Sequence, residues 1–112
     1  MKLITKAIEA TLPPLYSTEK QPAAEKVARV KFFAGGRGTW YAVEGERQEL
    51  DDGRMDLTMF GFCVSPLGPD CDEWGYFSLV EFEDSRLVER DLYFTPAPIG
   101  EVIAKRHPEI AL

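Results

Sequence analysis

The fold is decided by the stretch VARVKFFAGGRGTWYAVE, residues 27–44. Apolar and polar side chains alternate over residues 27–33, a pattern typical of a β-strand with one buried face. The glycine-rich segment 35–38 follows, and glycine readily adopts the positive φ angles that tight hairpin turns require. Residues 39–44 are rich in Thr, Trp, Tyr and Val, which favour the returning strand. We therefore predict a β-hairpin, one face of which is formed by Ala28, Val30 and Phe32.

Three further strands are predicted after the hairpin, over residues 55–64, 74–82 and 89–94. The charged residues 45–53 should form an exposed connection, and residues 65–73, with two prolines and a glycine, should form a loop. These gaps are too short for helical crossovers, so the strands are expected to pair in antiparallel fashion.

One helix is predicted near each end of the chain. The first spans residues 5–12, where Thr5 can act as the N-cap and a proline pair ends the helix. The second begins at Pro98 and ends before Pro108. Its apolar side is formed by Ile99, Val102 and Ile103. The order of elements indicates an α+β fold, with an antiparallel sheet of four to five strands and an N-terminal and a C-terminal helix packed on it.

Length and composition fit one domain spanning residues 1–112. The chain is 45% hydrophobic and 12% aromatic. A domain of this size buries roughly two-thirds of the surface that its unfolded chain exposes. That burial is sufficient for a core without disulfides or metal.

Several missing features indicate a cytoplasmic protein without a membrane anchor. No stretch approaches the roughly 20 apolar residues of a membrane span, and the apolar run at Leu3 and Ile4 is too short for a signal peptide. Cys63 and Cys71 are the only cysteines and form no Cys-x-x-Cys pair. The single histidine, His107, leaves too few ligands for zinc. We expect no metal and no cofactor.

Charge is distributed unevenly along the chain. The net charge is −6, but residues 1–43 carry seven Lys/Arg against three Asp/Glu, whereas residues 44–91 carry four against fourteen. The acidic middle of the chain argues against direct binding of nucleic acid, because phosphates are bound by Lys and Arg. It suits a basic protein partner, a cation, or a solvated face that serves only solubility.

The most suggestive polar grouping consists of four carboxylates, Glu81, Glu83, Glu89 and Asp91. Within each pair, residues two apart on a strand share a face. A hairpin across residues 84–87 would bring all four together, and Arg86 or Arg90 could neutralise them. Converging carboxylates raise one another's pKa and can bind a cation or act as acid and base. Three interpretations stay open: a structural or solubilising role, partner binding, and metal or acid–base chemistry.

Aromatic side chains are numerous, and most should lie in the core or on the sheet. Their number still allows one exposed aromatic patch suited to protein contact. The candidate binding residues are Glu81, Glu83, Glu89, Arg90, Asp91, Trp40 and Tyr76. No residue is assigned as catalytic or as a metal ligand.

Five motifs, taken in their order and spacing, resemble a known family. They are LPxLY (12–16), VKFF (30–33), TWYA (39–42), GYFSL (75–79) and ERDLYF (89–94). The family consists of small bacterial proteins classed as a domain of unknown function, and it is common on plasmids and other mobile elements. The glycine-rich turn 35–38 and the stretch 65–71 depart from its pattern. The resemblance implies a bacterial, cytoplasmic, single-domain protein and implies no catalytic residues.

The leading hypothesis is a non-enzymatic protein-interaction module. The acidic middle, the surplus of aromatic residues and the lack of a catalytic or cofactor motif motivate it. In the mobile-element setting implied by the resemblance, such a protein could occupy the basic, nucleic-acid-binding surface of a host defence complex. One alternative is a small hydrolase or metal-dependent enzyme that uses the four carboxylates with Arg90. Another is a domain that binds a small ligand in an aromatic-lined cleft. The partner is expected to be another protein, and the sequence leaves the oligomeric state undetermined.

Overall fold

The structure, a computed structural model, describes residues 2–68, 72–110 and 112. Its centre is an antiparallel sheet with the strand order β5-β4-β3-β2-β6. These strands are β2 (Val30–Ala34), β3 (Gly38–Glu49), β4 (Met55–Val64), β5 (Glu73–Ser78) and β6 (Glu89–Arg90). The predicted α+β class and antiparallel sheet are therefore confirmed.

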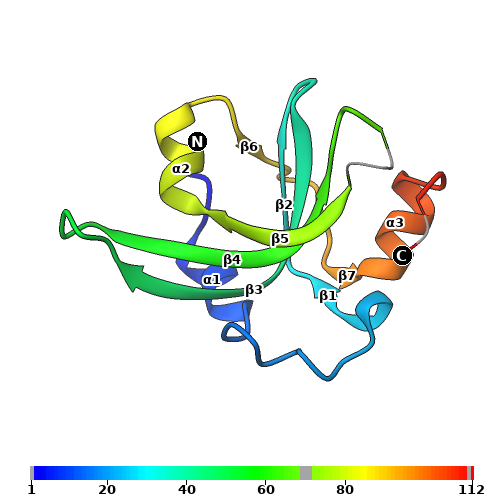
Figure 1. Cartoon of the computed structure of the whole chain (residues 1–112), viewed down its shortest axis with the longest axis horizontal. Coiled ribbons are helices and arrows are strands. Elements are labelled where there is room, and N and C mark those ends of the chain that lie inside the picture. The colour runs from blue at the N-terminus through cyan, green and yellow to red at the C-terminus, as the bar shows by residue number, and fades with distance from the viewer. Residues whose placement is uncertain (1, 69–71, 111) are drawn as a thin grey trace.

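Shorter elements surround this sheet (Figure 1). A second, two-stranded sheet pairs β1 with β7. The bounds are α1 (Lys6–Thr11), a short 3₁₀-helix η1 (Ala23–Glu25), β1 (Val27–Ala28), α2 (Leu79–Ser85), β7 (Ala97–Pro98) and α3 (Ile99–Arg106). Among the described residues, no helix has both the length and the apolar character needed to cross a membrane.

The sheet has an apolar cluster on each face. One face, here called the α2 face, carries Phe32 and Met59, which pack with Phe82 of α2 and with Leu3 and Ile4 near the N-terminus. The opposite face, the α3 face, carries Tyr41 and Phe62 against the buried side of α3. That side of α3 consists of Ile99, Val102 and Ile103. A helix packs on each face of the sheet, but α3 does not extend over the whole α3 face and leaves part of it uncovered.

A β-bulge decides which residues point to the α3 face. The register between β3 and β4 shifts between Ala42 and Glu44, so Ala42 pairs with Gly61 whereas Glu44 pairs with Phe60. Val43 is the extra residue, and an extra residue reverses the alternation of the side chains that follow. Glu44 therefore lies on the α3 face, in the same row as Phe60 and Tyr76.

The two strands approach closely at the bulge. A Cβ atom added to Gly61 would lie 1.7 Å from the carbonyl oxygen of Tyr41 and 2.9 Å from Cα of Ala42. Only glycine fits there, because both obstacles are backbone atoms. Beyond this point, β3 and β4 continue as a long ribbon that ends in the hairpin near α2 (Figure 1).

Several local predictions are confirmed. The first helix covers 6–11, and the Thr5 hydroxyl accepts a hydrogen bond of 3.1 Å from the amide of Ile8. The glycine-rich hairpin turn is present, with positive φ angles at Gly36 and Gly38. The strand at 55–64 and the helix that follows Pro98 have the predicted positions.

The predicted strand 27–33, however, is interrupted at Arg29, and its first two residues form β1. Ala28 packs in the cluster of the α3 face, whereas Val30 and Phe32 pack in that of the α2 face, so the predicted common face is wrong.

The strand predicted over residues 74–82 is wrong in its second half. The chain leaves the sheet after Ser78, and residues 79–85 form α2. The predicted exposed connection 45–53 is also too long, because β3 continues to Glu49. Of the strand predicted over 89–94, only Glu89 and Arg90 pair. Cys71, in the predicted loop 65–73, lies outside the described residues.

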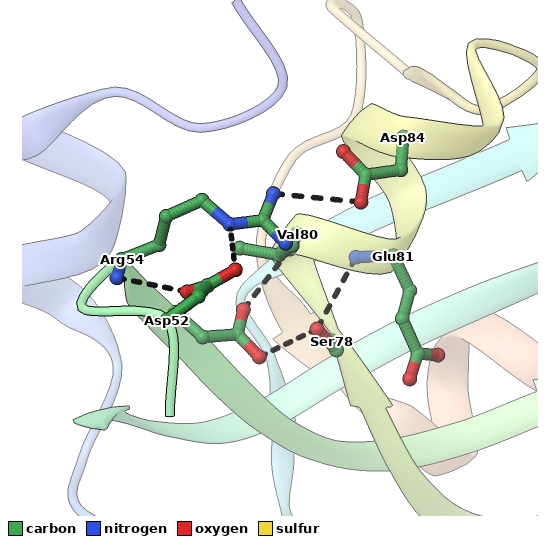
Figure 2. Close-up of polar contacts among 7 residues, drawn as sticks. Asp52, Arg54, Ser78, Val80, Glu81 and Asp84 are labelled. Atoms are coloured by element: carbon green, nitrogen blue, oxygen red, sulfur yellow. Dashed lines mark hydrogen bonds and ion pairs between the residues drawn. The ribbon is translucent and has the colours of Figure 1, made fainter. Parts of the chain in front are cut away.

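Two residues explain why α2 forms. The Ser78 hydroxyl accepts a hydrogen bond of 3.3 Å from the amide of Glu81 and donates one of 2.6 Å to the carboxylate of buried Asp56 (Figure 2). The same Asp56 side chain accepts from the amide of Val80 at 3.0 Å. These two side chains thus accept hydrogen bonds from two amides of the first turn, which would otherwise be unpaired. In addition, Arg54 lies between Asp52 and Asp84, at 2.8 and 3.5 Å, and joins the β3–β4 hairpin to α2.

Candidate functional site

A cleft opens on the uncovered part of the α3 face, and we call it the tyrosine cleft. Its volume is about 270 Å³. It is lined by Tyr16, Glu19, Lys26, Glu44, Phe60 and Tyr76. The sheet supplies the row Glu44, Phe60 and Tyr76, while the segment between α1 and β1 supplies the other three.

Two tyrosines form the exposed wall of the cleft. Tyr16 and Tyr76 are 64% and 54% exposed, and their rings meet edge-on with centroids 6.4 Å apart. The ring of Phe60 lies 5.1 Å from that of Tyr76 and stacks at 5.7 Å on Trp74. The Tyr16 side chain, together with nearby carboxylate charge, raises the pKa of Tyr76 above its ordinary value.

A buried carboxylate holds the segment that carries Tyr16. Glu44 is only 3% exposed. It accepts hydrogen bonds from the amide of Tyr16 at 2.8 Å, from the amide of Thr18 at 3.0 Å and from the Thr18 hydroxyl. Buried carboxylates need such donors, because desolvation of an unpaired charge is costly. Glu44 therefore serves as the anchor of residues 16–18.

A buried lysine completes the anchor. Lys26 is 7% exposed, and its ammonium group donates to the carbonyl oxygen of Thr18 and, at 3.1 Å, to the Thr18 hydroxyl. Because that hydroxyl in turn donates to Glu44, Thr18 links the two buried charges. The charges at the floor of the cleft thus balance, and the hydrogen-bond partners of both are in the segment that they hold.

The anchored segment contains a strained residue. Tyr16 has a φ angle of +69°, in the left-handed region that non-glycine residues adopt only at a cost. Such strain persists only where surrounding contacts enforce it, and it is concentrated at functional sites. Here the contacts with Glu44 enforce a conformation that directs an aromatic ring outward.

The four predicted carboxylates do not converge. Glu81 and Glu83 lie on α2, where residues two apart point about 200° from each other around the helix axis. The convergence predicted from a strand hairpin is therefore wrong. Glu83 and Glu89 do line one hollow of about 430 Å³, which Arg86 shares. Within the described residues, no group of three His, Cys, Asp or Glu side chains is placed to hold a metal ion.

The other candidate residues lie in separate places. Asp91 pairs with Lys31 at 3.3 Å and accepts a hydrogen bond of 2.9 Å from the amide of Tyr93. Burial alone would raise the pKa of Asp91, but these two partners lower it below its ordinary value. Arg90 pairs across the sheet with Phe32. Trp40 packs at 4.9 Å on Phe82 at the α2-face core, so of the predicted aromatic pair only Tyr76 lines the cleft.

Comparison with known proteins places the chain in a family. Residues 3–106 match the family model described as Protein of unknown function (DUF2958). The chain belongs to this family. The resemblance noted from the five motifs is thereby confirmed at the level of the family. No curated protein and no solved structure matches this DUF2958 domain.

The residues that anchor the cleft of the DUF2958 domain were not predicted from its sequence. Glu44 is an isolated carboxylate at the end of the apolar run Trp40–Val43, and such a position is a signal for a buried, hydrogen-bonded charge. The bulge decides on which face of the sheet the Glu44 side chain lies, and the alternation of residues in the sequence does not reveal the bulge. Tyr16 and Lys26 lie in a segment without periodicity, where the sequence holds no comparable signal.

The groups that the cleft of the DUF2958 domain offers to solvent are aromatic, hydroxyl and carboxylate groups. The Glu44 oxygens and the Lys26 ammonium group are engaged by the Tyr16–Thr18 segment, whereas Tyr16, Tyr76 and Glu19 of the lining are exposed to solvent. Tyrosine combines a large apolar surface with one polar group and loses little conformational entropy on binding. The arrangement is therefore suited to contact with another molecule.

Proposed function

We propose that this DUF2958 domain is a non-enzymatic protein-interaction module that binds its partner through the tyrosine cleft. One observation carries the proposal: two buried, opposite charges hold Tyr16 in a strained backbone conformation while its ring stays largely exposed. A ring needed only for the core would be buried. Exposed tyrosines of this kind are frequent among the residues that dominate protein interfaces.

The charge of the domain supports a basic partner. Residues 44–91 carry fourteen Asp/Glu against four Lys/Arg, and Glu81 and Glu83 of α2 are exposed. Complementary charge accelerates association and selects among partners. In the setting that the family resemblance implies, the module acts in the bacterial cytoplasm on behalf of a mobile element. Its partner there is the basic, nucleic-acid-binding surface of a host defence complex.

The test is affinity purification with matched variants. The tagged protein is expressed in a bacterial host, and the proteins that co-purify are quantified by mass spectrometry. We expect one partner near a 1:1 ratio with the wild type, and its loss with Tyr76→Ala. Tyr93→Ala is the control, because Tyr93 is 92% exposed and lies outside the cleft. Equal loss with both variants, or retention with both, contradicts a role of the cleft.

A small ligand is the second candidate, favoured by the aromatic walls of the same cleft. At about 270 Å³, the cleft lies just below the range of roughly 300–1,000 Å³ usual for ligand sites. A ligand that binds the folded state raises the melting temperature by mass action. A thermal-shift screen with a metabolite panel therefore tests this candidate. A shift that Tyr76→Ala abolishes would favour the ligand over the protein partner.

A further inference from the structure

The two edges of the main sheet differ in length and protection. One edge strand, β6, has only two residues, whereas the other, β5, has six. Among the described residues, β5 pairs with β4 alone, so its far side carries backbone N–H and C=O groups without a strand partner (Figure 1). An edge strand of this length is a template for another strand.

Apart from the charged Glu73 at its first position, the edge at β5 lacks the usual devices against such pairing. Natural edge strands are shortened, bulged, or marked by lysine or proline. The sequence of β5, EWGYFS, contains neither of these residues, and its register with β4 runs without a bulge from Glu73 to Ser78. The edge is thus open to an added strand, right beside the tyrosine cleft to which Tyr76 belongs.

We propose that β5 binds an extended, basic segment of a partner protein as an additional strand of the sheet. This inference rests on the proposed function and specifies the kind of partner. An added strand pairs with the whole row of backbone donors and acceptors, which makes this mode distinct from contact between side chains alone.

Cross-strand rows specify the side chains of the added strand. The row Glu44–Phe60–Tyr76 and the row Tyr41–Phe62–Trp74 both run toward the β5 edge on the α3 face. Partner residues opposite Tyr76 and Trp74 would continue these rows, with Cβ atoms about 4.5–5.5 Å away. They are two positions apart, and apolar, aromatic or arginine side chains suit them because each can pack on an aromatic ring.

The partner residue between these two faces Gly75. Nothing lies within 4 Å of a Cβ atom added there, so this position on the α2 face has free space. A large side chain on an adjacent strand can cover such a glycine, as aromatic residues do in sheets. The expected recognition pattern is therefore three consecutive residues with bulky side chains on alternating faces.

Charge argues for a basic partner and against a second copy of the chain. Residues 72–85, which span β5 and α2, contain five Asp/Glu and no Lys or Arg. Glu73, the first residue of β5, and Glu81, in the first turn of α2, are exposed. Pairing β5 with its own copy would bring these acidic segments together, and like charges directly opposite are destabilising. By contrast, these acidic segments would attract a partner segment that carries Lys and Arg on both sides of its three-residue core.

The experiment starts from peptides. A phage library of random 12-residue peptides is selected on the immobilised wild-type protein, and the best binder is synthesised with N-methyl groups on alternate amides, in two sets. N-methylation removes the N–H donor and blocks strand pairing. N-methylation of the amides that face β5 should lower the affinity of the peptide at least about tenfold. N-methylation of the other set of amides should change the affinity little. Hydrogen exchange should slow in residues 73–78 when the unmodified peptide binds.

A charge control completes the test. The double variant Glu73→Lys, Glu81→Lys should bind the peptide more weakly than the wild type does. Glu89→Lys, on the opposite edge at β6, should bind it as well as the wild type does. Any one of four results would overturn the inference. These are equal effects of the two N-methyl sets, protection from hydrogen exchange outside β5, a library without binders, and self-association through β5 in sedimentation velocity. If peptides lose binding with Tyr76→Ala but tolerate every N-methyl group, the inference fails while the proposed function stands. If Tyr76→Ala affects neither the peptides nor the co-purified partner, both fail.

Discussion

At the scale of single residues, the strained Tyr16 makes the clearest prediction. Glycine adopts φ of +69° without steric cost, whereas alanine keeps the strain and, like glycine, lacks the ring. We expect Tyr16→Gly to be more stable than Tyr16→Ala by about 1 kcal/mol in urea unfolding. Both variants should lose the partner, because both lack the exposed ring. An alanine variant as stable as the glycine variant would show that the backbone is not strained.

Glu44 is expected to be the most sensitive polar residue of the site. Glu44→Ala would leave two amides and a hydroxyl without their acceptor and would remove the negative charge that Thr18 links to Lys26. We expect a loss of about 3 kcal/mol or more in the free energy of unfolding.

The matched control for Glu44 is Glu46→Ala, two positions further along β3 at an exposed site. Its effect should stay within about 0.5 kcal/mol. Similar losses for the two variants in urea unfolding would contradict the anchoring role of Glu44.

His107 predicts how stability depends on pH. Its Nε2 lies 2.9 Å from the hydroxyl of fully buried Tyr41, and burial lowers the pKa of His107 below its ordinary value of 6.5. The folded state thus binds a proton less readily than the unfolded state. The contribution of neutral His107 to the free energy of unfolding is complete above about pH 6.5. It is lost as the pH falls from that value through the lowered pKa of the folded state.

Urea unfolding between pH 7.5 and 5 tests this dependence. We expect the wild type to lose stability on acidification and His107→Gln to lose less over the same interval. The lowered pKa of Asp91 acts in a separate window, below its ordinary value of 3.8. An identical slope for the wild type and the histidine variant would contradict the assignment.

At the scale of elements, α2 depends on a cap supplied from another strand. Ser78→Ala removes the N-cap and should cost about 1 kcal/mol. Asp56→Ala removes the acceptor of the Ser78 hydroxyl and of the Val80 amide at a buried site, so it should cost more, about 2–4 kcal/mol. The double variant should cost less than the sum, because the two residues share a hydrogen bond.

Asp52→Ala is the control for the cap of α2. Asp52 pairs with Arg54 near the same helix but is exposed, and exposed ion pairs contribute little. Denaturant unfolding of the four variants measures these differences. Additive costs of Ser78→Ala and Asp56→Ala would contradict a shared network.

At the scale of the whole molecule, the pairing of β3 with β4 at the centre of the sheet requires their close approach at Gly61. Gly61→Ala would place a Cβ atom against two backbone atoms of β3, so it should cost more than about 4 kcal/mol or prevent folding. Gly75→Ala is a matched control in the same cross-strand row, where the added atom meets free space. Its stability should change by less than about 1 kcal/mol. Melting temperatures followed by circular dichroism distinguish the two variants, and equal shifts would contradict the steric requirement for glycine at position 61.

Signals within short windows of sequence determined much of the fold. The alternation in 30–33, the glycine turn and the Thr5 cap each depend on neighbours only a few residues away, so the hairpin, the first helix and the α+β class could be predicted. The same kind of signal existed for α2, because Ser78 and Glu81 have capping-box spacing while Leu79 and Phe82 are three apart. The aromatic and apolar residues of 74–82 fit a strand as well, so the local pattern supports both structures at this point.

Only the tertiary structure decided the rest. Asp56, 22 residues before Ser78, selects the helix at that point by capping it. The bulge at Val43 turns Glu44 to the α3 face, and Glu44 then binds Thr18, 26 residues away. Tyr16 and Tyr76 meet only because these contacts place their segments side by side. Such positions depend on pairings distant in sequence, whose geometry no local pattern contains, and so the candidate site emerged from the fold rather than from the residues alone.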